Sequence, residues 1–414
     1  MRKPTPSTLA FVLAGGEGTR LFPLTTERCK PSVPFNGKYR LVDFVLSNLA
    51  NSGIPLAYLL VQHKAQGLIQ HVSSGNPVPV ADSGAVMQVT ALGPTLRNGR
   101  QHFTGTADAV AQNLHLIETH KPDLVAVFSA DHIYRMDVRQ MIDAHMAANA
   151  EITVATLPVP VSQCASFGIV ETDDELRIRA FQEKPAHTRS MPGRPGLALA
   201  SMGNYLFSAD VLQQELQRAD CAIESDFGSH ILPRLVRSRR MLAYDFTHNL
   251  IPGMADFEDN GYWRDVGTID AYFEAHLDTL GGRPKFRMAN PAWPIHSRMD
   301  TSGPVWIEGS YVTDSVVGAD CVVDSAQVRH SMLRRSVRVG RDADLSQAIV
   351  MDRSVVGRGA RIVRAIIDQD NCIPDGESIG VDLERDRKRF HVSKSGVVVV
   401  PRGHFSRTRN ASPP

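Results

Sequence analysis

The sequence predicts an α/β domain with a mostly parallel, doubly wound sheet, followed by a smaller domain built as a parallel β-helix. Two patterns support this prediction. From residue 1 to about residue 280, short apolar runs alternate with amphipathic stretches. From about residue 305 to residue 374, branched aliphatic residues recur at roughly six-residue spacing. With 414 residues, 43% of them hydrophobic, the chain can form two domains with full cores.

Five short apolar runs in the first domain are expected to be strands, because each is too short for a helix and rich in branched residues. They are LAFVLAG (9–15), LAYLLVQ (56–62), DLVAVFSAD (123–131), EITVATLPVP (151–160) and NYLFSAD (204–210). Helices are expected at 107–120 and 139–151. Sites in such sheets lie at the carboxyl ends of strands, so the glycine loop after the first strand and Asp131 should share one edge.

The second domain is expected over 305–414, after a linker at 281–304 that is rich in Gly, Pro and Arg and packs between the domains. Its repeats VVGADC (316–321), VRVGRDA (337–343) and SVVGRGA (354–360) share a Val-Gly step. Repeats this short favour a β-helix, in which each turn stacks on the next. A β-sandwich is the alternative, and the lack of hairpin signals weighs against it.

Charge and cysteine content narrow the class of protein. The net charge is +1, so no general basic field is available to bind nucleic acid. The five cysteines are scattered and form no Cys-x-x-Cys pair, which predicts reduced thiols in a cytoplasmic protein. We expect no membrane association, because no apolar stretch is long enough to span a bilayer.

The loop AGGEGTR (14–20) predicts contact with phosphates, because clustered glycines let backbone N–H groups approach an anion closely. It is not a Walker A loop, since Thr19-Arg20 stands where Lys-Ser/Thr is required. A dinucleotide fingerprint is disfavoured, because Leu21 occupies the place of the third glycine. A plain glycine turn and a nucleotidyltransferase loop remain. The longer pattern GGxGTRLxPLT…KPxxP, from Gly15 to Pro34, favours the nucleotidyltransferase loop.

Six further motifs follow this loop in order. They are GTADAV (105–110), SADHIYRMD (129–137), FQEKP (181–185), LASMGNYLF (199–207), SDFGSHILP (225–233) and YWRDVGTIDAY (262–272). With these motifs the chain resembles the sugar-nucleotide pyrophosphorylases, above all the bacterial branch that makes ADP-glucose. The resemblance covers nearly the whole chain. It implies a nucleotidyltransferase-like first domain, a left-handed β-helix, and a homotetramer controlled by an allosteric metabolite.

The implied reaction joins ATP to glucose 1-phosphate, giving ADP-glucose for glycogen synthesis and pyrophosphate. The sugar phosphate attacks the α-phosphorus in line, so the site needs positioning, cations and Mg²⁺ rather than a covalent nucleophile. The resemblance assigns catalysis to Arg20, Lys30, Asp131 and Asp265, nucleotide binding to Gly15, Gly16, Gly18, Thr19 and Gly105, and substrate binding to Phe103, Gly168, Glu183, Lys184 and Ser201.

Asp131 and Asp265 would also hold the Mg²⁺ ion, which usually takes one or two carboxylates together with phosphate oxygens. Each has a plainer alternative: Asp131 as a helix N-cap, and Asp265 as the ion-pair partner of Arg264. We expect a structural role for His132.

Two segments depart from the family pattern. His102-Phe103 stands where the family has Trp-Tyr, so the ring is kept at Phe103 and the hydroxyl is lost. Thr95 and Leu96 stand about where two glutamines help to read adenine. A missing amide relaxes base choice, which leaves UDP- or GDP-glucose as an alternative product.

The regulatory region departs as well. Glu27 stands where some bacterial members have an activator-binding lysine, and its carboxylate repels a sugar bisphosphate. Arg28 and Arg40 could still form an anion site between the domains, helped by Arg385 and Arg387. A solvated basic face is the alternative for these arginines. A non-catalytic regulatory subunit is the alternative for the whole chain, although its motif residues are intact.

Overall fold

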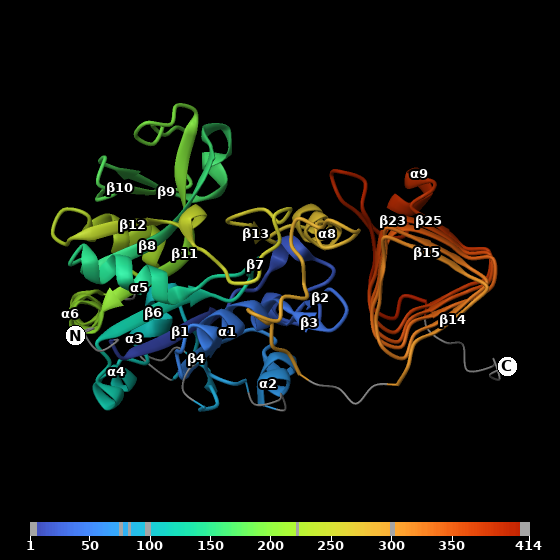
Figure 1. Ribbon diagram of the computed structural model, residues 1–414, viewed down its shortest axis with the longest axis horizontal. Coiled ribbons are helices and arrows are strands. Elements are labelled where there is room, and N and C mark those ends of the chain that lie inside the picture. Colours follow the sequence, from blue (N-terminus) through green and yellow to red (C-terminus); the bar gives the residue numbers. More distant parts are fainter. Residues whose placement is uncertain are drawn as a thin grey trace.

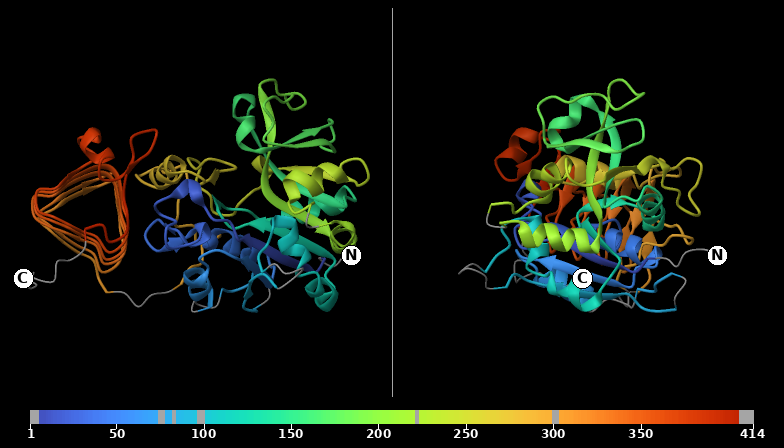
Figure 2. Two further views of the ribbon diagram at one scale, coloured as in Figure 1. Left: turned by 180° about the vertical axis from the view of Figure 1, so that it is seen from behind. Right: turned by 90° about the vertical axis from the view of Figure 1, so that its left-hand side faces the viewer.

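A computed structural model describes residues 6–73, 78–81, 84–95, 101–220, 223–298 and 303–405. Two domains lie side by side along the long axis of the molecule (Figure 1), and the views in Figure 2 show the same arrangement from behind and from the side. The first domain is built around a nine-stranded sheet. The second is a β-helix, whose triangular outline is seen end on in Figure 1. This is the α/β plus β-helix architecture that the two sequence patterns predict.

The strands of the central sheet are β1 (Thr8–Ala14), β4 (Leu56–Val61), β5 (Gln88–Leu92), β6 (Leu124–Ser129), β8 (Ile152–Pro160), β9 (Gly168–Thr172), β10 (Ile178–Glu183), β11 (Leu197–Ser208) and β12 (Met241–Asp245). Their spatial order is β10-β9-β11-β6-β1-β4-β5, with β8 beside β11 and β12 beside β8. β1 pairs in parallel with both β4 and β6. The carboxyl ends of these three strands therefore meet at one edge, which is where the glycine loop begins.

The sheet is mixed, and its antiparallel part is larger than the sequence indicates. β11 runs antiparallel to β6, β8 and β9, and β10 runs antiparallel to β9. Only residues 173–177 separate β9 from β10, and so short a connection can join only antiparallel neighbours. Parallel pairing is kept along β5-β4-β1-β6 and between β8 and β12.

The helices are α1 (Leu41–Asn51), α2 (Gln66–Ser73), α3 (Thr106–Ala111), α4 (His115–His120), α5 (Val138–Ala147), α6 (Ala209–Arg218), α7 (Leu232–Leu235), α8 (Ile269–Leu277) and α9 (Leu383–Arg387). The single helix expected at 107–120 is two helices, α3 and α4. Between them the Asn113 side chain donates a hydrogen bond to the Ala109 carbonyl at 2.9 Å. Asparagine competes in this way with the regular helical hydrogen bonds.

Both faces of the sheet are covered by helices, as a doubly wound sheet requires. Leu9 and Phe11 of β1 pack into one apolar cluster with residues of α3 and α6. Ala10 and Val12, which point to the opposite face, pack into a second cluster with residues of α1 and α5. The alternation along β1 follows from the two-residue period of a strand.

The described part of the first domain also contains four short strands, four 3₁₀ segments and one π-helical segment. The strands are β2 (Pro34–Phe35), β3 (Tyr39–Arg40), β7 (His132–Tyr134) and β13 (Trp263–Asp265). The 3₁₀ segments are η1 (Thr19–Leu21), η2 (Lys30–Ser32), η3 (Val161–Ser166) and η5 (Phe246–His248), and the π-helical segment is η4 (Phe227–Ile231). β2 pairs with β3, and β13 pairs antiparallel with β7.

The β-helix strands are β14 (Trp306–Glu308), β15 (Tyr311–Thr313), β16 (Val316–Val317), β17 (Val322–Asp324), β18 (Gln327–Arg329), β19 (Met332–Leu333), β20 (Arg338–Val339), β21 (Asp344–Val350), β22 (Val355–Val356), β23 (Arg361–Ile367), β24 (Cys372–Ile373), β25 (Ser378–Ile379), β26 (His391–Val392) and β27 (Val398–Val400). Trp306, Val322, Arg338, Val355 and Cys372 stand in register on successive parallel strands. Parallel stacking of successive turns excludes the β-sandwich.

An apolar cluster joins the two domains. It contains Phe35 and Phe44 from the first domain together with Met332, Ile366 and Val399 from the β-helix. Because these side chains share one core, the β-helix packs against the α/β domain rather than hanging from a flexible connection.

The segment expected as a linker, 281–304, lies partly outside the described residues, at 299–302. Its described part contains no helix or strand and lies along α1. The Pro294 carbonyl accepts from Asn51 Nδ2 at 2.9 Å, and the His296 N–H donates to Ser47 Oγ at 2.8 Å.

Among the described cysteines, Cys29, Cys164 and Cys321 are buried, Cys372 is half-buried, and all four are free thiols. Cys221 lies outside the described residues. In the part of the chain that the structure describes, no helix combines the length and the apolarity needed to cross a bilayer.

Candidate active site

The glycine-rich loop leaves the carboxyl end of β1 and turns into η1. Gly18 has a φ of 67°, and a Cβ at this position would lie 3.0 Å from Lys30 Cβ. Backbone conformation and space therefore both favour glycine here. The Gly18 carbonyl also accepts a hydrogen bond from Thr25 Oγ1 at 2.9 Å. These contacts fix the loop against the segment that contains Lys30.

The Lys30 ammonium lies between two carboxylates. Lys30 Nζ is 2.8 Å from Asp131 Oδ2 and 3.0 Å from Asp265 Oδ1. The lysine side chain is 8% exposed, whereas the two aspartates are 31% and 27% exposed, so the carboxylates are the accessible part of this group. Arg264, the alternative partner of Asp265, pairs instead with Asp278 at 2.6 Å.

Strand pairing brings the two aspartates together. Asp131 lies two residues after the end of β6 and directly before β7. β13 pairs antiparallel with β7, and in this register Asp265 stands opposite His132. The sequence-distant carboxylates are thus neighbours because one short two-stranded ribbon joins them.

The charges of this group support one another. Burial acts to raise the pKa of the Asp131 carboxyl, but the Lys30 ammonium and His132 outweigh it and hold that pKa well below its ordinary range. Burial likewise acts to lower the pKa of Lys30, and the carboxylates of Asp131 and Asp265 outweigh it and raise that pKa. Both groups are therefore charged at neutral pH, because each charge stabilises the other.

Arg20 completes the cationic side of the site. A Cβ on Gly267 would lie 2.9 Å from Arg20 Nη2 and 3.2 Å from both carboxylate oxygens of Asp265, so these groups meet above a glycine. One cavity of about 230 Å³ is lined by Leu13, Gly16, Gly18, Thr19, Arg20, Lys30, Pro31, Asp131 and Gly267. Loop backbone, two cations and a carboxylate thus face the same space, which suits a polyphosphate and a cation.

The two aspartates can also hold a divalent metal. Ligand atoms of Asp131, His132 and Asp265 all lie within 4.8 Å of one another. Hard cations prefer oxygen ligands, and a pair of carboxylates of which Asp131 lines the cavity fits that preference.

The segment before α3 closes another side of the site. The Phe103 backbone N–H donates to Gln62 Oε1, and Gln62 Nε2 donates to the Phe103 carbonyl at 3.4 Å. A Cβ on Gly15 would lie 3.9 Å from the Phe103 ring, so this ring packs beside the glycine loop. At Gly105 a Cβ would clash with the carbonyl of Ser225, so only glycine fits there.

The residues expected to bind the sugar lie around β9, β10 and β11. Lys184 Nζ is 3.0 Å from Glu183 Oε1, and the lysine side chain is 58% exposed. A Cβ on Gly168 or on Gly228 would lie 2.9 Å from Glu183 Oε2, so two glycines make room for this carboxylate. Ser201 is buried, and its Oγ accepts from the Gly203 N–H at 3.2 Å.

Trp263 connects this group to the aspartates. Its ring centroid is 4.9 Å from that of His132 and 5.8 Å from that of Phe167, which precedes Gly168. His132 Nε2 is in turn 3.4 Å from Asp131 Oδ1. Trp263 and His132 therefore link the residues expected to bind the sugar with the aspartates expected to hold the metal.

The segment expected to affect base choice is described only up to Thr95, and Leu96 lies outside the described residues. The Thr95 N–H and hydroxyl both donate to Gln112 Oε1, at 3.1 and 3.3 Å. Gln112 Nε2 also donates to Asp108 at 3.0 Å. The Gln112 amide, directly after α3, thus holds the loop where the family pattern has glutamines.

Arg28, expected to bind a regulatory anion, lies at the domain interface but already has a carboxylate partner. Its guanidinium is 3.1 Å from Asp368 of the β-helix, and both side chains are at least 90% buried. Glu27 pairs with Arg402 of the β-helix at 2.8 Å. The residues at the expected activator position therefore dock the two domains together.

The other expected regulatory arginines have different surroundings. Arg40 donates to the Ser32 carbonyl at 3.1 Å, and burial together with the nearby Arg334 guanidinium lowers its pKa. Arg385 and Arg387 lie on α9, where they pair with Glu377 and Glu384.

Several site residues were not assigned from the sequence. Three of them lie inside the motifs SDFGSHILP and YWRDVGTIDAY, namely Asp226, Gly228 and Gly267. Membership in these motifs was the signal that could have identified them. Gln62 lies just after β4, at the same sheet edge as the glycine loop. That position alone could have identified it.

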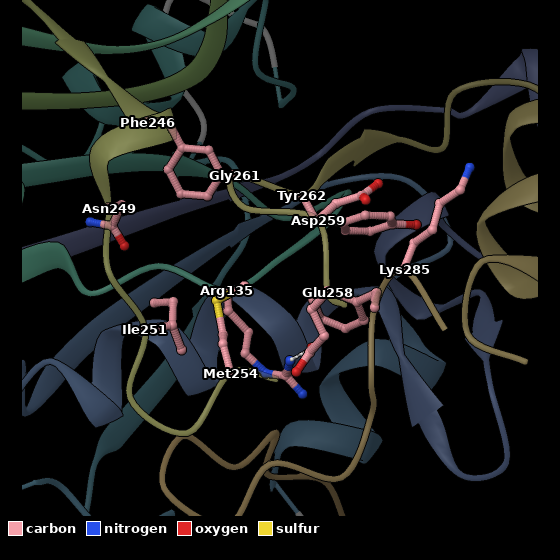
Figure 3. A pocket seen from close by; sticks show the side chains of 11 residues that line it. Arg135, Phe246, Asn249, Ile251, Met254, Glu258, Asp259, Gly261, Tyr262 and Lys285 are labelled. Atoms are coloured by element: carbon pink, nitrogen blue, oxygen red, sulfur yellow. Dashed lines mark hydrogen bonds and ion pairs between the residues drawn. The ribbon is translucent and has the colours of Figure 1, made fainter. Parts of the chain in front are cut away.

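A second hollow lies between Arg135, Glu258 and Tyr262 (Figure 3). Its free volume is about 10 Å³, which is room for about one water molecule. Arg135 Nη1 is 3.2 Å from Glu258 Oε2. This place is a packed ionic junction and not a substrate pocket.

Comparison with known proteins identifies both domains. The profile of the nucleotidyl transferase family matches residues 9–281, and that of the GlmU-like C-terminal hexapeptide matches residues 307–400, in agreement with a left-handed β-helix. Glucose-1-phosphate adenylyltransferase from Thermodesulfovibrio yellowstonii is 46% identical over 398 residues, 96% of each chain. The same enzyme from an Anaeromyxobacter species is 44% identical over 95% of this chain and 98% of its own. That from Corynebacterium jeikeium is 42% identical over 96% and 98%.

Proposed function

Because the chain belongs to the nucleotidyl transferase family, and within it to the glucose-1-phosphate adenylyltransferases, we infer that it transfers an adenylyl group from ATP to glucose 1-phosphate. The products are ADP-glucose, a glucosyl donor for glycogen synthesis, and pyrophosphate. One observation supports this chemistry most directly: Lys30 lies between Asp131 and Asp265 at the mouth of the glycine loop.

The chain's own residues would act by positioning and by neutralising charge. A phosphate oxygen of the sugar phosphate attacks the α-phosphorus of ATP, and pyrophosphate leaves from the opposite side. Negative charge spreads over the phosphate oxygens during this step. Arg20 and Lys30 face the cavity where that charge develops, and a fixed cation or donor of this kind typically contributes about 3 kcal/mol.

We propose that Asp131 and Asp265 hold Mg²⁺. Together with Lys30 the two carboxylates form a group with one net negative charge, which attracts a divalent cation. A bound Mg²⁺ ion would supply further charge neutralisation at the phosphates. The lysine fixes the two carboxylates in place before the metal and the nucleotide arrive.

We propose the remaining roles residue by residue. The loop glycines Gly15, Gly16 and Gly18, with Thr19, would surround the triphosphate, and Gly105 with Phe103 would close that side. Lys184 would bind the phosphate of glucose 1-phosphate, since its side chain is exposed and can reach. Glu183 and Ser201 would contact sugar hydroxyls beside Gly168.

The test is product formation by purified protein with glucose 1-phosphate, Mg²⁺, and ATP, UTP, GTP or dTTP in separate reactions. We expect ADP-glucose from ATP, and loss of at least about 100-fold in Asp131→Asn. Asp143→Asn, an exposed aspartate on α5, is the matched control and should keep full activity. Preference for another base would refute the adenylyl assignment. The absence of product with every base would favour a regulatory subunit.

We also propose a homotetramer, a regulatory anionic metabolite and a cytoplasmic location. Exposed Trp306 and Tyr311 on the first turn of the β-helix support assembly. Arg40, which is half-buried near the Arg334 guanidinium, supports regulation by an anion, whereas Arg28 is already paired with Asp368. Four described free cysteines support a reducing compartment. Light scattering of the purified protein tests the first proposal, and activity with and without phosphorylated metabolites tests the second.

A further inference from the structure

The hydroxyl of Thr106 joins two parts of the site that are far apart in sequence. Thr106 is the first residue of α3, directly after Gly105. Its Oγ1 donates to Asp226 Oδ2 at 2.8 Å and accepts from the Phe227 N–H at 3.0 Å. The hydroxyl therefore both donates and accepts a hydrogen bond, and both bonds go to the segment 226–227.

The backbone strengthens this junction. The Ser225 carbonyl accepts from the N–H groups of Ala107 and Asp108, at 2.8 and 3.1 Å. The Gly105 backbone lies so close to the same carbonyl that a Cβ would clash with it. The beginning of α3 is thus held against residues 225–227.

One end of the junction leads to the proposed nucleotide side. Only Thr104 separates Gly105 from Phe103, whose ring packs beside Gly15 of the glycine loop. Gln62 holds the Phe103 backbone through both its N–H and its carbonyl. A displacement of α3 would therefore displace the wall of the glycine loop.

The other end leads to the proposed sugar side. Asp226 Oδ1 accepts from the Ser229 N–H at 2.9 Å, which fixes the turn around Gly228. A Cβ on Gly228 would lie 2.9 Å from Glu183 Oε2, so this turn packs directly against the Glu183 carboxylate. Lys184 Nζ forms an ion pair with the same carboxylate at 3.0 Å.

We propose that Thr106 is a positioning residue that couples binding of the nucleotide to binding of the sugar phosphate. It touches neither substrate; it holds the Phe103–Gly105 segment and the Asp226–Gly228 turn in one arrangement. Occupation of the nucleotide side then favours the geometry that the sugar side needs. This inference rests on the proposed function, because it requires both substrates to bind one site.

The test compares the unmodified chain with Thr106→Val and Thr106→Ser. Calorimetry gives the Kd of glucose 1-phosphate with and without an unreactive ATP analogue and Mg²⁺, and steady-state kinetics give kcat and both KM values. Valine keeps the shape and removes both hydrogen bonds, whereas serine keeps them. Thr119→Val is the matched control, because the Thr119 hydroxyl donates only within α4, to the His115 carbonyl at 2.8 Å.

We expect the analogue to tighten sugar-phosphate binding in the unmodified chain, and this factor to fall about 10-fold in Thr106→Val. The KM for glucose 1-phosphate should rise by a similar factor at saturating ATP, with a smaller effect on the ATP Kd measured alone. Thr106→Ser and Thr119→Val should stay within about 2-fold of the unmodified chain. If Thr106→Val does not fold, Thr106→Ala carries the same expectation.

Equal coupling in the unmodified chain and in Thr106→Val would overturn this inference alone, provided that the unmodified chain makes ADP-glucose. A uniform weakening of both substrates, with no change in coupling, would also overturn it, because a purely structural role predicts that result. The absence of any product from the unmodified chain would overturn the proposed function, and this inference with it.

Discussion

Replacing Lys30 with methionine would test the central electrostatic argument. Methionine has similar length and no charge, so the change removes the ammonium and leaves Asp131 and Asp265 facing each other. Their ligand oxygens lie within 4.8 Å. At an effective dielectric constant of about 20, two negative charges at that distance repel by roughly 3 kcal/mol. Partial exposure of both carboxylates makes this an upper value.

Two opposite effects should follow. Turnover should fall about 100- to 1,000-fold, because one cation facing the phosphates is lost. Binding of Mg²⁺ should tighten, because the ammonium no longer competes for the carboxylates. Addition of Mg²⁺ should therefore raise the thermal midpoint of Lys30→Met more than that of the unmodified chain.

The assay measures kcat with ATP and glucose 1-phosphate, and the thermal midpoint over a range of Mg²⁺ concentrations. Lys285→Met is the matched control, since it removes an exposed lysine that pairs with Asp278 at 3.2 Å and does not contact Asp131 or Asp265 among the described ion pairs. A kcat within about 3-fold of the unmodified value would refute the catalytic argument. An equal Mg²⁺ effect on both proteins would refute the argument that lysine and metal share the carboxylates.

Three further predictions concern the fold around the site. Gly105→Ala should lower kcat/KM at least about 10-fold and reduce the thermal midpoint, because its Cβ would clash with the Ser225 carbonyl; unchanged kinetics would contradict this packing. Arg28→Met should destabilise the protein by about 3–5 kcal/mol in urea unfolding, because it leaves Asp368 buried without a cation. The double variant Arg28→Met/Asp368→Leu should recover most of that loss, because it removes the buried carboxylate as well. Burial lowers the pKa of His276 to about 3, so the unfolded chain takes up this proton first and stability falls as pH drops from about 6.5 towards 3. This residue should make the protein roughly 2 kcal/mol less stable at pH 5 than at pH 8, and a stability independent of pH in this range would contradict the assignment.

Much of the architecture could be predicted from the sequence because it depends on neighbouring residues. The alternation of buried faces in β1 is visible in the run LAFVLAG, and the six-residue repeat indicates stacked turns. The glycine loop was recognisable from its clustered glycines and the longer motif, and the φ of 67° at Gly18 is one that glycine adopts readily. These signals are local, so one sequence is enough to show them.

The antiparallel half of the sheet could not be predicted in the same way. The runs that form β8 and β11 have apolar residues that suit either direction of pairing. Direction depends on the order of strands in space, which the local pattern does not contain. The split of the expected helix at Asn113 has a similar origin, because a side-chain hydrogen bond outweighed a continuous helical pattern.

By itself, the sequence determined the two-domain class, the phosphate-facing loop and, through its motifs, the set of residues that the site would need. Only the tertiary structure decided how those residues meet. Lys30 reaches Asp265 because β13 pairs with β7, and Arg28 is neutralised because the β-helix places Asp368 beside it. Contacts between residues more than 200 positions apart arise from strand order and domain docking, and no pattern of neighbouring residues specifies them.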